Sequence, residues 1–223
     1  MESIYDKRIM QFYNNTYYHL YNRTNNEEAL FRSEENYLYF LKKYRFYLDD
    51  YLETIGYCLM PTHFHFLVRV REIDGLHLGG GVHQKDYDGG KDGLHLGGGV
   101  HLLSREISDK IGILLSSYTK AINKSYNRHG SLLQEHTKAK PIPSDKYLIN
   151  LLTYIHQNPL RSGLVAKADE WLYSSYQDYI NLRNGTLPSK ELILGMIKKE
   201  ELKELTEKRI FDMIDVRIDV PHI

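Results

Sequence analysis

The chain has 223 residues, a formal net charge of zero and a single cysteine, Cys58. A lone cysteine excludes an internal disulfide, and a zero net charge excludes a global field that attracts nucleic acid or an anionic membrane. The N-terminus is polar and no apolar run approaches the roughly 20 residues of a membrane helix. We therefore expect a cytoplasmic protein without a membrane partner, built as one domain with additions.

The first third of the chain predicts strands around one helix. Apolar residues recur at spacings of three and four between Ser33 and Tyr51, which predicts an amphipathic helix capped by Ser33. Three segments have the composition and alternation of strands: 17–24, 54–60 and 63–70. Pro61-Thr62 joins the last two strands through a tight turn.

A repeat interrupts this pattern after Val70. The nine residues 75–83 recur letter for letter at 93–101, with polar, glycine-rich sequence between the copies. Such glycine density disfavours both helix and strand. We therefore expect an inserted loop at about 72–103. Its histidines offer a weaker alternative, a metal-binding tract.

The rest of the chain predicts three helices and one strand. The helices have apolar stripes, and they span about 104–127, 144–158 and 189–215. Pro159 predicts the end of the helix at 144–158, because helical conformation is disfavoured for the residue before a proline. A fourth strand begins at 132–134 and ends before Pro141. The order predicts an α+β fold, a ferredoxin-like split βαβ antiparallel sheet with helices on one face, an added helix and a C-terminal helix.

Positive charge gathers in one part of this neutral chain. From Ser104 to Lys167 there are ten Lys and Arg residues against four Asp and Glu. Lys120, Lys124 and Arg128 are spaced by four, so they share one exposed face of the predicted helix. This face is a candidate contact for a DNA backbone, and a solvated face without a partner is the alternative.

The residues that suggest chemistry are two histidines, His63 and His65, separated by one residue on a predicted strand. Alternation along a strand points both imidazoles to the same side, while Phe64 and Phe66 point to the other. The imidazoles can hold a divalent cation between them. Taken alone, such a pair is more often two half-exposed histidines on an amphipathic strand.

A second motif favours the metal site over two half-exposed histidines. Tyr154-Ile155-His156-Gln157-Asn158-Pro159 lies on a predicted helix, where Tyr154 and Asn158 share a face. Together with Met60-Pro61 before His63-Phe64-His65, and Gly163 after Pro159, it resembles the REP-associated tyrosine transposases. These belong to the single-tyrosine HUH transposases of bacterial insertion sequences. Further similarities are Tyr21-Asn22-Arg23, the stretch 130–134, and Trp171 with Ser174-Ser175-Tyr176.

This resemblance covers roughly residues 16–180 apart from the insert, so we expect a transposase domain at 1–180 and a helical extension at 181–223. It implies that His63 and His65 bind Mg²⁺ or Mn²⁺, with Asn158 as third ligand, and that Tyr154 is the nucleophile. The implied substrate is single-stranded DNA with a hairpin. The implied product is a 5′-phosphotyrosine, and the sequence leaves a homodimer open.

Other functions share parts of this pattern. A non-catalytic module can bind single strands on an aromatic sheet without His63, His65 or Tyr154. A metal-dependent hydrolase would use water in place of Tyr154. A replication initiator or relaxase shares the HUH chemistry, although the spacing of Tyr154 from Pro159 and Gly163 favours the transposase.

Overall fold

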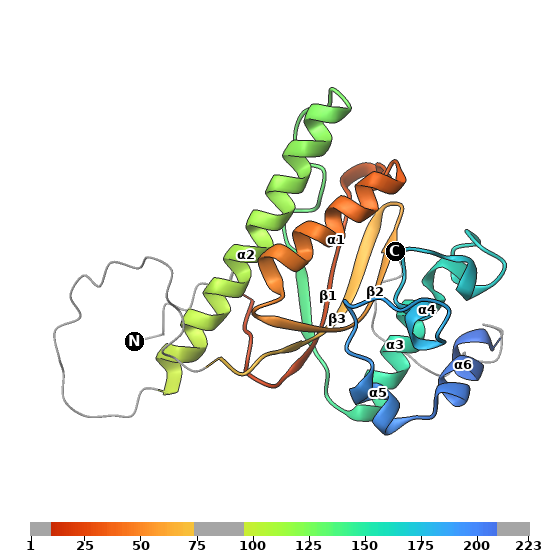
Figure 1. Cartoon of the computed structure of the whole chain (residues 1–223). Coiled ribbons are helices and arrows are strands. Elements are labelled where there is room, and N and C mark those ends of the chain that lie inside the picture. The colour runs from red at the N-terminus through yellow and green to blue at the C-terminus, as the bar shows by residue number, and fades with distance from the viewer. Residues whose placement is uncertain (1–9, 74–95, 209–223) are drawn as a thin grey trace.

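In the computed structural model, which describes residues 10–73 and 96–208, the centre of the molecule is a four-stranded antiparallel sheet (Figure 1). Its order is β2-β3-β1-β4. The strands are β1 (Tyr17–Arg23), β2 (Leu52–Met60), β3 (His63–Val70) and β4 (Lys138–Pro141). The central pair, β1 and β3, aligns Tyr21 with His65 and Arg23 with His63. This is the expected ferredoxin-like order, and the α+β fold class is confirmed.

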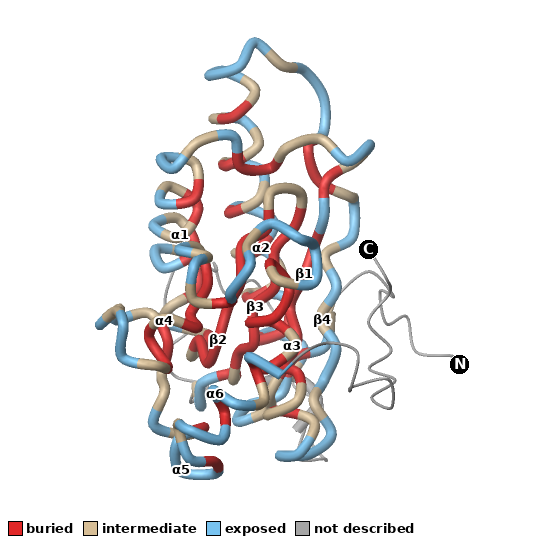
Figure 2. The backbone as a smooth tube through the Cα atoms, turned by 90° about the vertical axis from the view of Figure 1, so that its right-hand side faces the viewer, coloured by how far each residue is buried: buried red, intermediate tan, exposed pale blue. Residues whose placement is uncertain are grey.

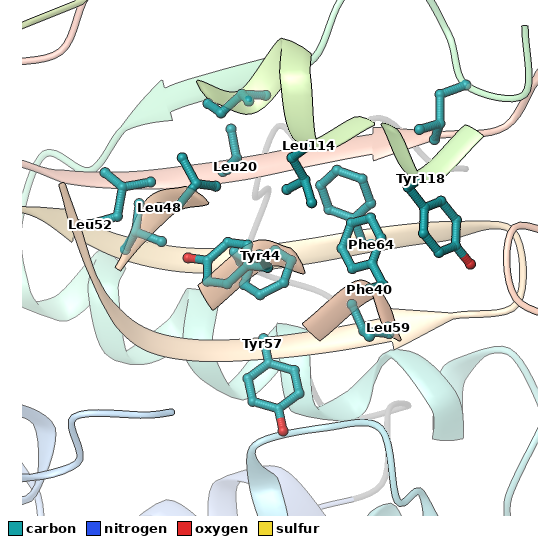
Figure 3. Close-up of a cluster of buried hydrophobic side chains, with 14 of the residues drawn as sticks. Leu20, Phe40, Tyr44, Leu48, Leu52, Tyr57, Leu59, Phe64, Leu114 and Tyr118 are labelled. Atoms are coloured by element: carbon teal, nitrogen blue, oxygen red, sulfur yellow. The ribbon is translucent and has the colours of Figure 1, made fainter. Parts of the chain in front are cut away.

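One face of the sheet is covered by two helices. They are α1 (Glu34–Leu48) and α2 (Leu96–Ser125). Figure 3 shows the aromatic packing between them and the strands, in which Phe40 and Tyr44 of α1 meet Phe64 and its neighbours on β3. The ring of Tyr44 stacks on Phe66 with centroids 4.0 Å apart. The alternation that sends Phe64 and Phe66 into this core leaves His63 and His65 on the opposite face.

That opposite face is covered by α3 (Asp145–Arg161), which packs on β2 and β3. Its buried residues Leu148, Leu151, Leu152 and Ile155 follow a helical period and form a second core. Ser144 caps the helix, because its side chain accepts a hydrogen bond from the backbone N–H of Tyr147. Figure 2 shows the central strands as mostly buried tube and the helices as tube that is only partly buried.

The segment after α3 braces the outer edge of β2. It contains a short turn of 3₁₀ helix (Ala168–Glu170) and α4 (Tyr176–Tyr179). Trp171 donates its indole N–H to the carbonyl of Leu59 at 3.0 Å, and the backbone at Ser174 bridges to Cys58. An edge strand that would otherwise offer unpaired backbone groups is thus covered. No helix within the described residues is long and apolar enough to cross a membrane.

The insert is shorter than the sequence predicts. The helix expected from Ser104 begins at Leu96, so residues 96–103 are helical, and Leu103 packs in the core beside α1. Ser104 exchanges hydrogen bonds with the backbone of Phe12, at 2.8 and 3.2 Å. These contacts favour helix where local glycine content disfavours it. The remainder of the expected loop, 74–95, lies outside the described residues.

Three other predicted boundaries were wrong. The fourth strand is Lys138–Pro141, while Leu133 makes only an isolated bridge to Thr24. The last helix is broken into α5 (Glu191–Met196) and α6 (Lys199–Glu207), because Ile197 has extended backbone angles. Residues 209–215 of that prediction lie outside the described part. The third wrong boundary is the end of α3, which was predicted at 158 and continues past Pro159 to Arg161.

Candidate active site

The two histidines of β3 lie where the face of the sheet meets α3. His63 is 8 % exposed, His65 is fully buried, and their ring centroids are 5.1 Å apart. The hydroxyl of Thr62 lies 3.1 Å from Nδ1 of His63. The sheet thus brings the paired imidazoles together on one face, as the alternation predicts.

A third histidine, His19 on β1, completes this group. Its Nε2 shares a hydrogen bond of 2.9 Å with Nδ1 of His65, and the two rings stack with centroids 5.1 Å apart. Tyr21 also stacks on His19, with centroids 4.6 Å apart, and its ring lies 6.0 Å from that of His65. Sequence reasoning missed His19. Strand alternation places it on the same face as Tyr21, but only the pairing of β1 with β3 brings it to His65.

Burial keeps these imidazoles neutral. It lowers the pKa of His63 to about 4, with the positive charge of Arg23 acting in the same direction. The pKa of His65 lies well below its ordinary value, first through burial and then through its histidine neighbours. Burial, followed by the charge of Lys140, lowers the pKa of His19 to about 3. Neutral imidazole is the form that binds metal ions.

Tyr154 brings a phenol to the same group from α3. Its ring meets His65 edge-on, with the centroids 6.1 Å apart. The guanidinium of Arg161, two turns further along α3, lies 5.5 Å from the centre of the Tyr154 ring. Burial raises the pKa of Tyr154, while the charge of Arg161 lowers it and Tyr21 raises it. In the free protein burial dominates, so the phenol is protonated at neutral pH.

Asn158 lies one turn after Tyr154 and is 6 % exposed. Its side-chain nitrogen donates to the carbonyls of Tyr154, at 2.9 Å, and Ile155, at 3.5 Å. Pro159 has no N–H to offer the carbonyl of Ile155, so the amide of Asn158 supplies the missing donor. This explains why α3 continues through Pro159. The amide oxygen of Asn158 is the atom left for a ligand.

The residues present fit a divalent metal ion. The Nε2 atom of His65 is buried and has no hydrogen-bond partner, while its Nδ1 is held by His19. A ligating histidine commonly has its second nitrogen fixed in this way. Within residues 10–73 and 96–208, no three His, Cys, Asp or Glu side chains form a metal-binding group. The ligand set implied by the resemblance, His63, His65 and Asn158, stays a prediction.

A buried polar cluster anchors α3 behind this site. Nε2 of His156 lies 2.8 Å from the hydroxyl of Ser175, which also accepts the backbone N–H of Tyr57 at 2.9 Å. Gly56 lies against the same cluster, where a β-carbon would overlap Leu152 of α3. The close approach of α3 to β2 thus requires glycine at position 56.

No family model matches this chain. A known protein resembles it in sequence. A putative REP-associated tyrosine transposase of Haemophilus influenzae is 24 % identical over 124 residues, which are 56 % of this chain and 58 % of the relative. The chain resembles the REP-associated tyrosine transposases. The resemblance expected from the two motifs is thereby confirmed, over less than two thirds of that transposase's length.

Two solved structures show weaker overall likeness. A REP-associated tyrosine transposase bound to a REP hairpin has 18 % identity and a TM-score of 0.48, covering 80 % of this chain and 86 % of that chain. A bacterial tRNA(His) guanylyltransferase-like protein in complex with GTP has 8 % identity and a TM-score of 0.43. That match covers 70 % of this chain and 68 % of the other.

The three basic residues singled out from the sequence lie away from the candidate site, and Arg128 lies beyond α2, which ends at Ser125. Lys120 and Lys124 are exposed, on the helix that covers the other face of the sheet. Lys120 borders a groove of about 790 Å³ between α2 and residues 130–138. Arg128 is already paired with Glu28, because its guanidinium donates to both carboxylate oxygens, at 2.7 and 2.8 Å. A role for these three residues in DNA binding stays a prediction.

Proposed function

We propose that this chain is a transposase-type enzyme that cuts and rejoins single-stranded DNA beside a hairpin, through a covalent bond to Tyr154. The observation that carries the proposal is the edge-on contact of Tyr154 with His65, 6.1 Å between centroids, within one chain. A phenol and a pair of imidazoles from distant parts of the sequence thus lie close together within one chain. The name of the relative supports the same activity.

Tyr154 is the nucleophile in this proposal. Its phenolic oxygen attacks the phosphorus of a phosphodiester and loses its proton, and a bond forms between that oxygen and the 5′ phosphate. The bond from phosphorus to the 3′ oxygen breaks, and the 3′ oxygen leaves as a hydroxyl after taking up a proton. The reverse attack, by a 3′ hydroxyl on the phosphotyrosine, rejoins a strand. The bond energy is conserved, so joining requires no nucleotide cofactor.

His63, His65 and Asn158 would hold the divalent ion, Mg²⁺ or Mn²⁺, and two imidazoles with one amide suit Mn²⁺ better. When bound, the ion would offset the charge of the attacked phosphate and favour the phenolate of Tyr154. His19 contributes by accepting the Nδ1 proton of His65. That tautomer of His65 leaves the lone pair of its Nε2 available for a ligand.

The test is covalent capture of a hairpin-bearing oligonucleotide in Mn²⁺. We expect wild-type protein to form a denaturation-resistant adduct on the 5′ side of the cut, and Tyr154→Phe to form none. The matched control is Tyr147→Phe, a tyrosine two turns earlier on α3, which should keep the adduct. His63→Ala and His65→Ala should lose cleavage and Mn²⁺ binding together.

Two of the alternative functions give a different result in this test. Binding without any adduct, unchanged by His63→Ala, would identify a strand-binding module. Cleavage that survives Tyr154→Phe, with no protein-linked DNA, would identify a hydrolase that uses water. A replication initiator or relaxase would form the same adduct, because it shares this chemistry.

A further inference from the structure

Three partly buried arginines among the described residues are each neutralised by a carboxylate. Arg69 pairs with Glu53 at 2.5 Å, Arg128 with Glu28 at 2.7 Å, and Arg183 with the buried Asp178 at 2.6 Å. Such pairs cancel the local field of each arginine.

The surroundings of the candidate site differ. Arg23, Lys140 and Arg161 are all exposed. Within residues 10–73 and 96–208, no salt bridge joins Arg23 or Arg161 to a carboxylate, and Arg161 donates only to the neutral side chain of Gln157 at 3.3 Å. These two arginines therefore present uncompensated positive charge beside the histidines and the tyrosine.

Each of the three cations lies beside a different member of the site. Arg23 is the cross-strand neighbour of His63, and Lys140 is the cross-strand neighbour of His19. The guanidinium of Arg161 lies 5.5 Å from the centre of the Tyr154 ring.

The three cations come from three elements that surround the site. Arg23 ends β1 directly opposite His63, and Lys140 lies on the edge strand β4 opposite His19. Arg161 ends α3, which covers the neighbouring strands β2 and β3. Figure 2 shows β4 as largely exposed tube at the side of the molecule, next to the buried tube of β1 and β3. Positive charge thus flanks the histidines on the β1–β4 side and Tyr154 on the α3 side.

We propose that Arg23, Lys140 and Arg161, here called the cationic rim, bind the phosphates of a single DNA strand on both sides of the phosphate that Tyr154 attacks. This inference rests on the proposed function for the identity of the attacked phosphate. The rim provides charge without a base-reading pattern, so it positions the strand and does not select its sequence. The proposal also places the DNA strand on the face of the sheet opposite to Lys120 and Lys124.

The test is the salt dependence of binding to a fluorescently labelled oligothymidine strand, in metal-free buffer and in the Tyr154→Phe background. Each phosphate of a single strand that a protein neutralises adds about 0.7 to the slope of log K against log salt. We expect the triple variant Arg23→Gln, Lys140→Gln, Arg161→Gln to bind with a slope smaller by about 2, since it neutralises three fewer phosphates. All three positions are exposed, so the variant should keep its fold.

The matched control removes three exposed lysines from the other face of the sheet: Lys42→Gln, Lys120→Gln and Lys124→Gln. Its slope should remain close to that of the parent protein. An unchanged slope in the rim variant, or an equal decrease in the control, overturns the proposal. The assay needs no cleavage. A chain that forms no adduct, but whose rim variant has the smaller slope, would refute the proposed function and retain the rim.

Discussion

The hydrogen bond between His19 and His65 makes a sharp prediction about metal binding. Replacing His19 with Phe keeps an aromatic ring beside Tyr21 and His65, but removes the partner of Nδ1 of His65 at 2.9 Å. Because His65 is fully buried, water cannot replace that partner. A buried polar group left without a partner costs about 1–3 kcal/mol.

The expected decrease in metal affinity follows from the role of such second partners. Removing the group that orients a ligating histidine lowers metal affinity by about 10- to 100-fold. For His19→Phe we therefore expect the dissociation constant for Mn²⁺ to rise by that factor, which corresponds to about 1.4–2.7 kcal/mol. Isothermal titration of the metal into DNA-free protein measures it directly.

His19→Gln is the control that separates orientation from folding. The amide oxygen of glutamine can accept the Nδ1 proton of His65 as the ring nitrogen does, so most of the affinity should return. The thermal midpoints of both variants report any general loss of structure. Mn²⁺ affinity in His19→Phe equal to that of the wild type would refute an orienting role for His19.

Three further outcomes are expected. Gly56→Ala should destabilise the protein by about 1–3 kcal/mol in urea unfolding, because its β-carbon overlaps Leu152; Gly112→Ala, with open space around it in α2, should stabilise it by up to about 1 kcal/mol. Burial lowers the pKa of His156 to about 3, so the unfolded chain takes up a proton first as pH falls. Its contribution to stability is complete above pH 6.5 and is lost toward pH 3, and unfolding curves should show that His156→Gln removes about 1.4 kcal/mol per pH unit from the acid slope. Finally, the candidate ligands are neutral, so the negative charge that a bound Mn²⁺ attracts must come from the DNA phosphate. An oligonucleotide should therefore tighten Mn²⁺ binding to the Tyr154→Phe protein, and Mn²⁺ should tighten oligonucleotide binding by the same factor. Independent binding of the two would contradict this reasoning.

Much of the fold was accessible from the sequence because local patterns decide it. The alternation in β1 and β3 and the apolar period of α1 and α3 are properties of neighbouring residues, and each of these elements lies within a few residues of its predicted bounds. The strand order followed from the order of elements along the chain. The contact of Tyr154 with His65 then follows from placing α3 on the face opposite to Phe64.

The parts that sequence reasoning missed depend on distant partners. The start of α2 is stabilised by the contacts of Leu103 and Ser104 with the core and with Phe12. β4 pairs with β1 through Lys138–Pro141, and nothing local favours that register over one at Leu132–Gln134. His19 and the uncompensated charge of Arg23 become meaningful only once the sheet register is known.

Asn158 has two roles in this protein, and this affects how mutations of the site should be interpreted. Its amide nitrogen completes the helix at the gap that Pro159 creates, while its oxygen is the candidate ligand. Truncation to alanine would remove both at once, so an inactive Asn158→Ala protein would not by itself identify a ligand. Pairing that substitution with Pro159→Ala restores the backbone donor to the carbonyl of Ile155. The double substitution therefore isolates the contribution of the amide oxygen.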